Sequence, residues 1–494
     1  MMHVPHRAIG LESAWIKGCS PIAQGSAAVR GRSSPRPAAL LRRLRGLAPI
    51  LLGLLWAGPV HAILPIQHWT TAAGAKVYFV ESRGLPMLDV SVDFPAGSAY
   101  DSAEKAGLAG LTQALLRRGA DGMTEDEVSG RFADVGAQLG GRFDSDRAGL
   151  SLRTLSSERE RTVALETLAR VLQQPAFPQA VLERERARIL SGLREADTKP
   201  DTIGSRTFAR LVFRDHPYAL RGSGEIETLP RIAREDLQRF HAARYTADRA
   251  VIAIMGDVSR ADAGRIAEQL TSRLTRKGGS ETLPGVAPLG KGEVRRIAHP
   301  ASQSHILVGA PGIRRSDPDY FPLFVGNWVL GGGGFSSRLN AEVRQNRGLA
   351  YSVYSYFNPA LREGGFQIGL QTRKDQADEA LAVVTQTVRA FVKDGPTAAE
   401  LDQAKSNIGG GFPLRIDSNR KILEYLAVIG FYDLPIDYLD NFVKRVEAVT
   451  VEDVRRAFRR AIDPDALVTV VVGAEAAAAG AGSDAQGDAA RAAR

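Results

Sequence analysis

The chain has 494 residues, of which 24% are charged and 44% are hydrophobic, with 50 Gly, 25 Pro and a single Cys. This composition excludes a collagen-like repeat, a disulfide-rich scaffold and wholesale disorder, and it is typical of a globular protein. At about 150 residues per domain, we expect two to four domains. The net charge of +9 points at face value to an anionic partner such as nucleic acid or a membrane surface.

Most of that charge lies in a leader at the N-terminus. Residues 1–62 carry eight cations and one anion, and an apolar segment at residues 46–60 follows a cluster of arginines. The leader ends in the small-residue sequence Val60-His61-Ala62, which together with the arginines is the pattern of a secretory signal. We therefore expect the protein to be exported, to the periplasm, with this leader removed.

Removal of the leader changes what the charge implies. The remaining 432 residues carry a charge of +2, so neither nucleic acid nor a membrane is expected as a partner. A membrane span needs about 20 apolar residues, whereas Pro49 and Gly53 interrupt the apolar segment of the leader. The only cysteine, Cys19, leaves with the leader, so we expect no disulfide and no thiolate for catalysis or metal binding.

The predicted elements that follow alternate between strands and helices. Residues 75–101 contain two alternating apolar runs separated by Arg83-Gly84, which predicts a pair of adjacent strands. Their order predicts an α+β fold in which a mostly antiparallel sheet has helices packed on one face. The other expected elements, in chain order, are a helix at 102–118, a strand at 148–155, helices at 158–173, 178–197 and 234–243, and a strand at 250–256.

The helix and strand at residues 234–257 have a second copy near the C-terminus. REDLQRFHAARYTADRAVIAIMGD aligns without gaps with VEDVRRAFRRAIDPDALVTVVVGA, so that Glu235 matches Glu452 and Gly256 matches Gly473. A constant offset of 217 residues indicates a duplicated domain. We predict two homologous domains at residues 63–274 and 294–474, an exposed Gly- and Pro-rich linker at 275–293, and a disordered tail at 475–494.

Local catalytic motifs are missing from this sequence. None of the five histidines after the leader lies three to five residues from another on a predicted helix, and the chain has neither a GxSxG elbow nor a Walker loop. A run of four glycines follows a helical pattern, so we interpret it as a flexible loop that lets a substrate chain approach closely. These residues are Gly331, Gly332, Gly333 and Gly334.

The stretch VSVDFPAGSAYDSAEKAGLAGLTQALLRRGA, residues 90–120, resembles the opening domain of the pitrilysin/insulinase-type zinc peptidases, the inverzincins that include mitochondrial processing peptidase. In that family a helix carries the motif HxxEH, whose i, i+3 and i+4 positions share one helix face. The resemblance places Gly110 at the first His, Gln113 at the Glu that serves as base, and Ala114 at the second His.

The family's third zinc ligand is a Glu on a later helix, with another Glu seven residues before it. The segment ERARILSG resembles this region, with Glu185 retained and Gly192 at the ligand position. Glycine and alanine offer no donor atoms, so the resemblance implies that this chain binds no zinc and has no base for a zinc-bound water.

The second half, in contrast, retains a functional motif. GGGGFSSRLNAEVRQNRGLAYSVYSYF resembles the family's C-terminal-half motif, in which an Arg and a Tyr face the zinc site across a chamber; here these are Arg344 and Tyr351. A guanidinium and a phenol are donors suited to a carbonyl oxygen that gains negative charge during peptide cleavage.

The resemblance implies a division of labour between two chains. We expect a non-catalytic subunit, inactive alone, of a heterodimeric zinc peptidase, with the zinc held by an HxxEH-bearing partner and each subunit forming half of a clam-like chamber. Unfolded peptides held as an added strand are the implied substrates. A purely structural or peptide-binding protein of the same fold, like the core subunits of the respiratory cytochrome bc complex, and a single-chain metallopeptidase with a rearranged site stay open as alternatives.

Overall fold

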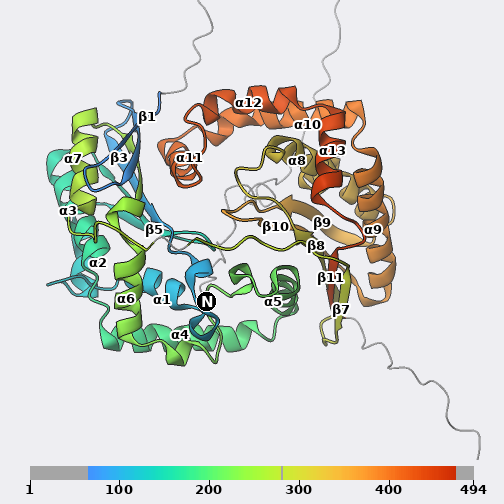
Figure 1. Cartoon of the computed structure of the whole chain (residues 1–494), viewed down its shortest axis with the longest axis horizontal. Helices are drawn as coiled ribbons and strands as arrows, with labels where there is room; N and C mark the ends of the chain where they lie inside the picture. Colours follow the sequence, from blue (N-terminus) through green and yellow to red (C-terminus); the bar gives the residue numbers. More distant parts are fainter. Residues whose placement is uncertain (1–64, 280–281, 474–494) are drawn as a thin grey trace, which may run out of the picture.

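The computed structural model describes residues 65–279 and 282–473, so the predicted leader at 1–62 and the tail at 475–494 lie outside the described residues. Two halves face each other, one built on a six-stranded sheet and the other on a five-stranded sheet (Figure 1). No helix within these described ranges is long and apolar enough to span a membrane. The α+β class with two related sheets is therefore confirmed.

The first sheet has the order β1-β2-β6-β3-β5-β4, and only the β2/β6 pair is parallel. The second has the order β7-β11-β8-β10-β9, and only β7/β11 is parallel. The strands of the first sheet are Gln67–Thr70, Lys76–Glu81, Met87–Phe94, Gln138–Phe143, Ala148–Leu155 and Val251–Gly256, for β1 to β6. Those of the second are Glu293–Ile297, Gln303–Pro311, Ala350–Phe357, Gly365–Arg373 and Val468–Val472, for β7 to β11.

The two sheets are copies in strand order and in register. Lys76 pairs with Val251 in the first sheet, and Glu293 pairs with Val468 in the second, both shifted by 217 residues. This is the offset that the sequence alignment gives, and it extends the duplication to strands whose sequences show no similarity. The extra strand of the first sheet, β1, has no counterpart among the second-sheet strands.

The prediction that β2 and β3 are adjacent is wrong, although both strands are present. β6 lies between them, parallel to β2 and antiparallel to β3. Passing over one strand requires about 10 Å, because neighbouring strands lie about 4.8 Å apart. The connecting residues 82–86 are long enough for this crossing, so the short separation in sequence does not enforce a hairpin.

Seven α-helices in the described part of the first half and six in that of the second connect the strands. Several begin with a capping box, for example Thr124 with Glu127 before α2 and Thr397 with Glu400 before α10. In the first half they are α1 Leu108–Leu115, α2 Glu125–Asp134, α3 Glu158–Gln173, α4 Gln179–Ala196, α5 Pro200–Phe213, α6 Arg234–Arg244 and α7 Arg260–Thr271. In the second they are α8 Tyr320–Asn327, α9 Ala377–Asp394, α10 Ala398–Gly411, α11 Asn419–Phe431, α12 Tyr438–Ala448 and α13 Val451–Ala461.

Helix α1 is shorter than the helix predicted at 102–118. Gly107 has a φ of +99°, which ends any continuous helix before Leu108. Asp101 then anchors the start of α1, because its carboxylate accepts hydrogen bonds from the amides of Gly107 and Ala109, both at 2.8 Å. Burial outweighs these hydrogen bonds and raises the pKa of Asp101 to about 7.

The two halves exchange a helix. Helix α11 of the second half packs against β2, β3 and β6 of the first sheet, and α5 of the first half packs against β8 and β11 of the second (Figure 1). Along β2, Val77 and Phe79 point into the core under the first half's own helices, whereas Tyr78 and Val80 belong to the core that contains α11. Each half's own helices therefore cover one face of its sheet, and the other half covers the opposite face.

A buried carboxylate also joins residues of both halves. Asp146, in the turn between β4 and β5, accepts hydrogen bonds from the Tyr218 hydroxyl at 2.5 Å, the Leu361 amide at 2.8 Å and the Tyr432 hydroxyl at 3.1 Å. Leu361 and Tyr432 come from the second half. Beside it, the Arg147 guanidinium carbon lies 5.6 Å from the centre of the Tyr432 ring.

The segment at 275–293, predicted as an exposed linker, is partly packed. Leu283 is buried in a small apolar cluster with Ala99, Tyr218 and Ala360, which unites residues of both halves. The carbonyl of Pro284 lies 3.0 Å from Nε2 of His216. The prediction of exposure is wrong at Leu283, because this residue lies in the seam between the halves, whereas Pro284 beside it is exposed as predicted.

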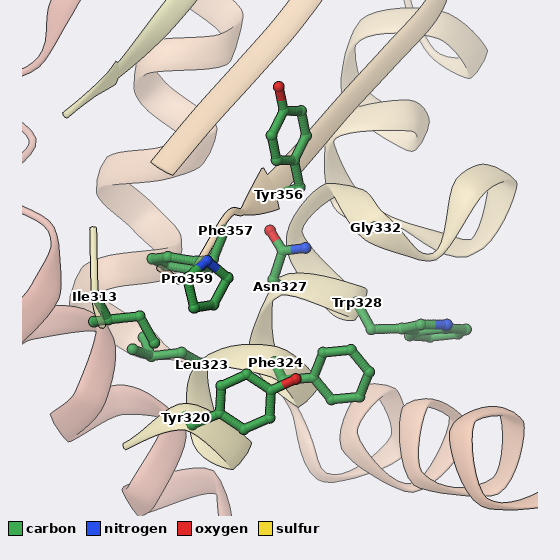
Figure 2. A pocket seen from close by; sticks show the side chains of 10 residues that line it. All are labelled: Ile313, Tyr320, Leu323, Phe324, Asn327, Trp328, Gly332, Tyr356, Phe357 and Pro359. Atoms are coloured by element: carbon green, nitrogen blue, oxygen red, sulfur yellow. The ribbon is translucent and has the colours of Figure 1, made fainter. Parts of the chain in front are cut away.

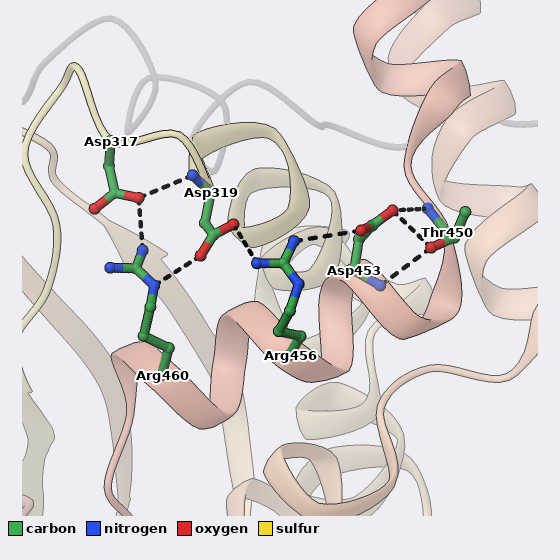
Figure 3. Close-up of polar contacts among 6 residues, drawn as sticks. All are labelled: Asp317, Asp319, Thr450, Asp453, Arg456 and Arg460. Atoms are coloured by element: carbon green, nitrogen blue, oxygen red, sulfur yellow. Dashed lines mark hydrogen bonds and ion pairs between the residues drawn. The ribbon is translucent and has the colours of Figure 1, made fainter.

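Within the second half, α13 is fixed by a ladder of ion pairs that Figure 3 shows. Buried Asp319 receives Arg456 at 3.0 Å and Arg460 at 2.7 Å, and Arg460 also contacts Asp317 at 2.6 Å. Asp453 completes the ladder by capping the start of α13 with Thr450. Because Asp319 is buried and receives two arginines, these ion pairs fasten α13 to the segment before α8 more strongly than a single surface salt bridge would.

The close packing of α11 on the first sheet can be tested at Gly430. A Cβ there would lie 2.5 Å from Tyr78 and 2.6 Å from Val251, so Gly430→Ala is expected to lower the free energy of unfolding by about 1–3 kcal/mol. In the matched control, Gly410→Ala in α10, no atom lies within 4 Å of the new methyl group, and a gain of up to about 1 kcal/mol is expected. Urea unfolding measures both, and equal effects would refute this packing.

The Asp146 contact predicts a pH-dependent stability. Burial and then repulsion from Asp144 raise the pKa of Asp146 from 3.8 to about 6, so the folded protein binds this proton more tightly than the unfolded chain does. The stabilisation that protonated Asp146 gives the folded state is fully present below about pH 4 and is lost as the pH rises through 6. Relative to Asp146→Asn, the parent should lose up to about 3 kcal/mol of unfolding free energy between pH 4 and 7. Parallel pH profiles in urea titrations would contradict this assignment.

Candidate functional site

The first candidate site lies on α1, where the first ligand position has no room for a side chain. A Cβ on Gly110 would lie 2.3 Å from the carbonyl oxygen of Gly222. Real atoms do not approach so closely, so any residue other than glycine requires the backbone at 222 to move. Gly222 itself packs against Phe143, and the neighbouring Arg221 is held by Asp197 at 2.8 Å. The position that corresponds to the first His is therefore filled by backbone.

The position of the base is occupied by a fully engaged amide. The Nε2 of Gln113 donates a hydrogen bond to the carbonyl of Gly149 at 2.6 Å, and its Oε1 accepts one from the Tyr245 hydroxyl at 3.1 Å. Gln113 is 5% exposed and Tyr245 is 1% exposed. This amide fastens α1 to strand β5, so it serves packing rather than proton transfer.

The third ligand position also lacks the surroundings of a metal site. Gly192, on α4, is exposed and has no atom within 4 Å of a notional Cβ. Glu185, the retained family residue, lies on the same helix seven residues earlier and is buried. Its carboxylate pairs with Arg188 at 2.8 Å and with Arg118 and Arg184 at 3.7 Å. Its carboxylate is thus engaged by arginines.

The residues present do not fit a zinc ion. Gly110, Ala114 and Gly192 offer no donor atom, and the backbone of Gly222 fills the space beside the first of them. Elsewhere in residues 65–279 and 282–473, no group of three His, Cys, Asp or Glu side chains has the arrangement of a metal site. A rearranged single-chain zinc site therefore finds no support in the described part of the chain.

The second candidate site brings Arg344 and Tyr351 together. Arg344 lies in a π-helix, η10 (Asn340–Gln345), and Tyr351 is the second residue of strand β9. The guanidinium carbon of Arg344 lies 4.6 Å from the ring centre of Tyr351 and 4.6 Å from that of Phe335. Tyr351 is 82% exposed and Phe335 is 57% exposed, so this sandwich stands open to solvent.

Phe335 is the residue of this sandwich that the sequence analysis missed. It directly follows the four glycines, and an aromatic residue after a glycine run was the available signal. Cation–π attraction on both faces orients the guanidinium without neutralising it. Among the described residues no carboxylate pairs with Arg344, whereas the nearby Arg338 is paired with Glu400 at 2.7 Å. The N–H donors of Arg344 therefore face solvent.

The glycine run is not the flexible loop predicted for it. Gly331 and Gly332 end a π-helix, η8 (Trp328–Gly332), and a Cβ on Gly331 would lie 2.4 Å from the Ser355 hydroxyl. A Cβ on Gly333 would meet the Trp328 carbonyl at 2.7 Å. Only Gly334, with a φ of +59°, has open space beside it. Most of the run is thus glycine because Gly331 packs tightly against β9 and Gly332 and Gly333 pack against Asn327 and Trp328 of the preceding helical turns. The role of the run in substrate binding stays a prediction.

A small apolar pocket lies behind this segment, and Figure 2 shows its lining. The rings of Tyr320 and Phe324 stack on one side at 5.9 Å, and Asn327 lies near the centre, where it donates to the Ser355 carbonyl at 3.0 Å. The free volume is about 40 Å³, enough for a water molecule or two but not for a peptide side chain. This pocket is therefore a packing defect rather than a candidate ligand site.

Comparison with known proteins agrees with this fold. The chain matches the family "Insulinase (Peptidase family M16)" over residues 78–221 and "Peptidase M16 inactive domain" over residues 231–408. A crystal structure of a peptidase M16 inactive domain from Pseudomonas fluorescens is 38% identical, with a TM-score of 0.81, covering 84% of this chain and 99% of the other. The chain therefore belongs to the insulinase family, peptidase family M16, and it lacks the family's HxxEH motif.

More distant relatives carry differing descriptions. An uncharacterized zinc protease of Mycobacterium leprae is 26% identical over 390 residues, covering 78% of this chain and 86% of that protein. A non-peptidase homolog of Helicobacter pylori is 25% identical over 418 residues, covering 83% and 93%. The crystal structure of a protease from the same organism has a TM-score of 0.76 at 18% identity, covering 83% of this chain and 100% of the other. At that identity it supports the fold alone.

Restoring the family's residues is expected not to restore the metal site. The combined variant Gly110→His, Gln113→Glu, Ala114→His and Gly192→Glu should bind no stoichiometric zinc, because the Gly222 carbonyl occupies the space that the first His requires. Metal analysis of the purified variant measures this. Gly192→Glu alone is the control and should melt like the parent, because its surroundings are open. One zinc per chain at the parent's melting temperature would show that the site is only missing its ligands.

Proposed function

We propose that this chain is the non-catalytic subunit of an exported, heterodimeric zinc peptidase of the insulinase family. Its partner, a homologous chain with an intact HxxEH motif, supplies zinc, ligands and base. This chain supplies Arg344 and Tyr351 and half of the enclosing chamber, and unfolded peptides are the substrates. The observation that carries the proposal is the contrast between a first site filled by its own backbone and a second site whose donors are exposed.

The geometry of the second site supports a role toward a peptide carbonyl. Tyr351 lies on β9, the terminal strand of the second sheet, and an extended peptide that pairs with a terminal strand passes close to side chains of that strand. A guanidinium held between two rings and a phenol beside it present donors that strengthen as negative charge develops on a carbonyl oxygen. Positioning of these groups by the fold is the contribution that a subunit without metal can make.

The proposal of export rests on the leader sequence. Arginines before an apolar segment at residues 46–60, and the ending at Ala62, match a secretory signal. The absence of cysteine after that point makes the folded chain independent of the redox state of its compartment.

A purely structural or peptide-binding protein is the second candidate. The Helicobacter pylori relative described as a non-peptidase homolog favours it, because that protein matches this chain over most of both lengths. In this case the exposed sandwich of Phe335, Arg344 and Tyr351 would hold peptides without any cleavage.

Hydrolysis by the reconstituted pair distinguishes these functions. The chain alone should be inert toward an unstructured peptide, and the chain mixed with its HxxEH partner should be active. Arg344→Ala and Tyr351→Phe should each lower kcat/KM of the pair by about tenfold to a hundredfold, because each removes a donor to the transition state.

Arg347→Ala is the matched control, since Arg347 lies in the same segment but pairs with Glu342. It should leave turnover unchanged. If both site variants retained full activity in the pair, the shared-site proposal would be wrong. If the pair never cleaved peptide, the structural or peptide-binding function would be the one supported.

A further inference from the structure

Arg117 is a cation in the turn after the degenerate metal-site helix α1, and the proposed function does not use it. It comes three residues after Ala114 and four after Gln113, and Nε2 of Gln113 lies 3.1 Å from the point where a Cβ of Gly141 would be. Its guanidinium carbon lies 3.7 Å from the point where a Cβ of Gly141 would be. Gly141 is an exposed residue of β4, the terminal strand of the first sheet. The cation therefore lies against a strand that is open to pairing.

The charge of Arg117 has no counterion within the described residues. Its Nε is buried and has no hydrogen-bond partner. Burial, and then repulsion from Arg118, hold the pKa of Arg117 below its ordinary value of 12.5. The neighbouring Arg118, by contrast, pairs with Glu125 and, at 3.7 Å, with Glu185. An unpaired, partly buried guanidinium is costly to the fold, so the structure holds a charge that an anion would stabilise.

A cavity of about 220 Å³ opens beside this guanidinium. Arg117 and Arg118 form its polar wall, and Leu139 of β4 lies on the strand side. The side chains of Val128 and Phe132, on α2, give it an apolar floor, and both are at most 5% exposed. Cation, apolar floor and terminal strand thus meet in one place.

We infer that this cavity binds the C-terminal residue of an extended peptide, with the terminal carboxylate on Arg117 and an apolar last side chain on Val128 and Phe132. This inference rests on the proposed function, because it takes the bound ligand to be an unfolded peptide added to the edge of β4. A guanidinium forms two parallel hydrogen bonds with a carboxylate, which gives such a site selectivity for free chain ends.

The three features favour a peptide end over other anions. An inorganic phosphate gains nothing from an apolar floor, whereas the final residue of a peptide carries an apolar side chain and a carboxylate on one carbon atom. Main-chain hydrogen bonds to β4 supply affinity that is independent of sequence. The site thus selects cleavage products and other peptides that end in a large apolar residue.

Binding of matched peptides to the full chain tests the inference. The probe is an unstructured, N-terminally fluorescein-labelled octapeptide ending in leucine, compared with the same peptide carrying a C-terminal amide. We expect the free acid to bind at least about tenfold more tightly in fluorescence anisotropy, because an ionised partner roughly doubles the strength of a hydrogen bond. Arg117→Gln should abolish this preference without lowering the melting temperature, since Arg117 has no partner to lose.

Two further variants keep the test sharp. Arg170→Gln removes an exposed arginine of α3 and should retain the full preference. Ser129→Glu places a carboxylate on the cavity wall, where it pairs with Arg117, and should abolish the preference while leaving the amide's affinity unchanged.

Equal binding of acid and amide by the parent chain would overturn the inference and leave the proposed function intact. The same conclusion holds if Arg117→Gln keeps the preference. A chain that binds neither peptide, although the assembled pair cleaves them, would also overturn the inference but not the subunit role. A chain that binds neither peptide in a pair that is inert would remove the proposed function as well.

Discussion

The exchange of helices between the halves is the constraint on which the rest of this structure depends. Each sheet is apolar on both faces, and its own helices cover only one of them. The second face of the first sheet, with Tyr78, Val80 and Val251, is covered by α11, and that of the second sheet by Phe208 and Val212 of α5. Removing either half would expose these apolar faces to water at a cost of about 25 cal/mol for each Å². The halves therefore fold as one unit, and the seam with Asp146 at its centre is a consequence of that exchange.

The path of the chain after α5 shows that the metal site is missing in space and not only in sequence. After α5 crosses to the second sheet, the chain returns toward α1 through residues 214–224, and this return passes Gly222 against Gly110. The salt bridge of Arg221 with Asp197 fixes the path at the end of α4. A histidine at 110 would have to displace a segment whose route is set by packing in the other half. The glycine at position 110 is thus linked to the path of the chain between α5 and α6.

Much of this fold is readable from the sequence because its signals are local. Strand β5 and helix α3 begin and end where the patterns predict, and the offset of 217 between Gly256 and Gly473 already relates the two sheets. What fails is long-range pairing: β6 inserts between β2 and β3 from far along the chain, which local alternation does not encode. The exchange of α5 and α11 could not be predicted for the same reason. An apolar face in the sequence indicates that something covers it, but not which element does so. In the candidate site, the family resemblance pointed to Arg344 and Tyr351, which lie on adjoining elements, whereas Phe335 approaches from a separate turn and belongs to no motif.

The second half of this chain holds its arginines in two different ways, and the difference bears on function. Arg338 and Arg456 are paired with carboxylates, and such pairing satisfies charge and N–H donors together. Arg344 is held instead by two aromatic faces, which attract the cation but accept none of its in-plane hydrogen bonds. The guanidinium is therefore fixed in orientation while its donor capacity is left for a ligand. The proposed role in peptide cleavage depends on such preorganisation, because donors that are already in place need no rearrangement when charge develops on the carbonyl oxygen.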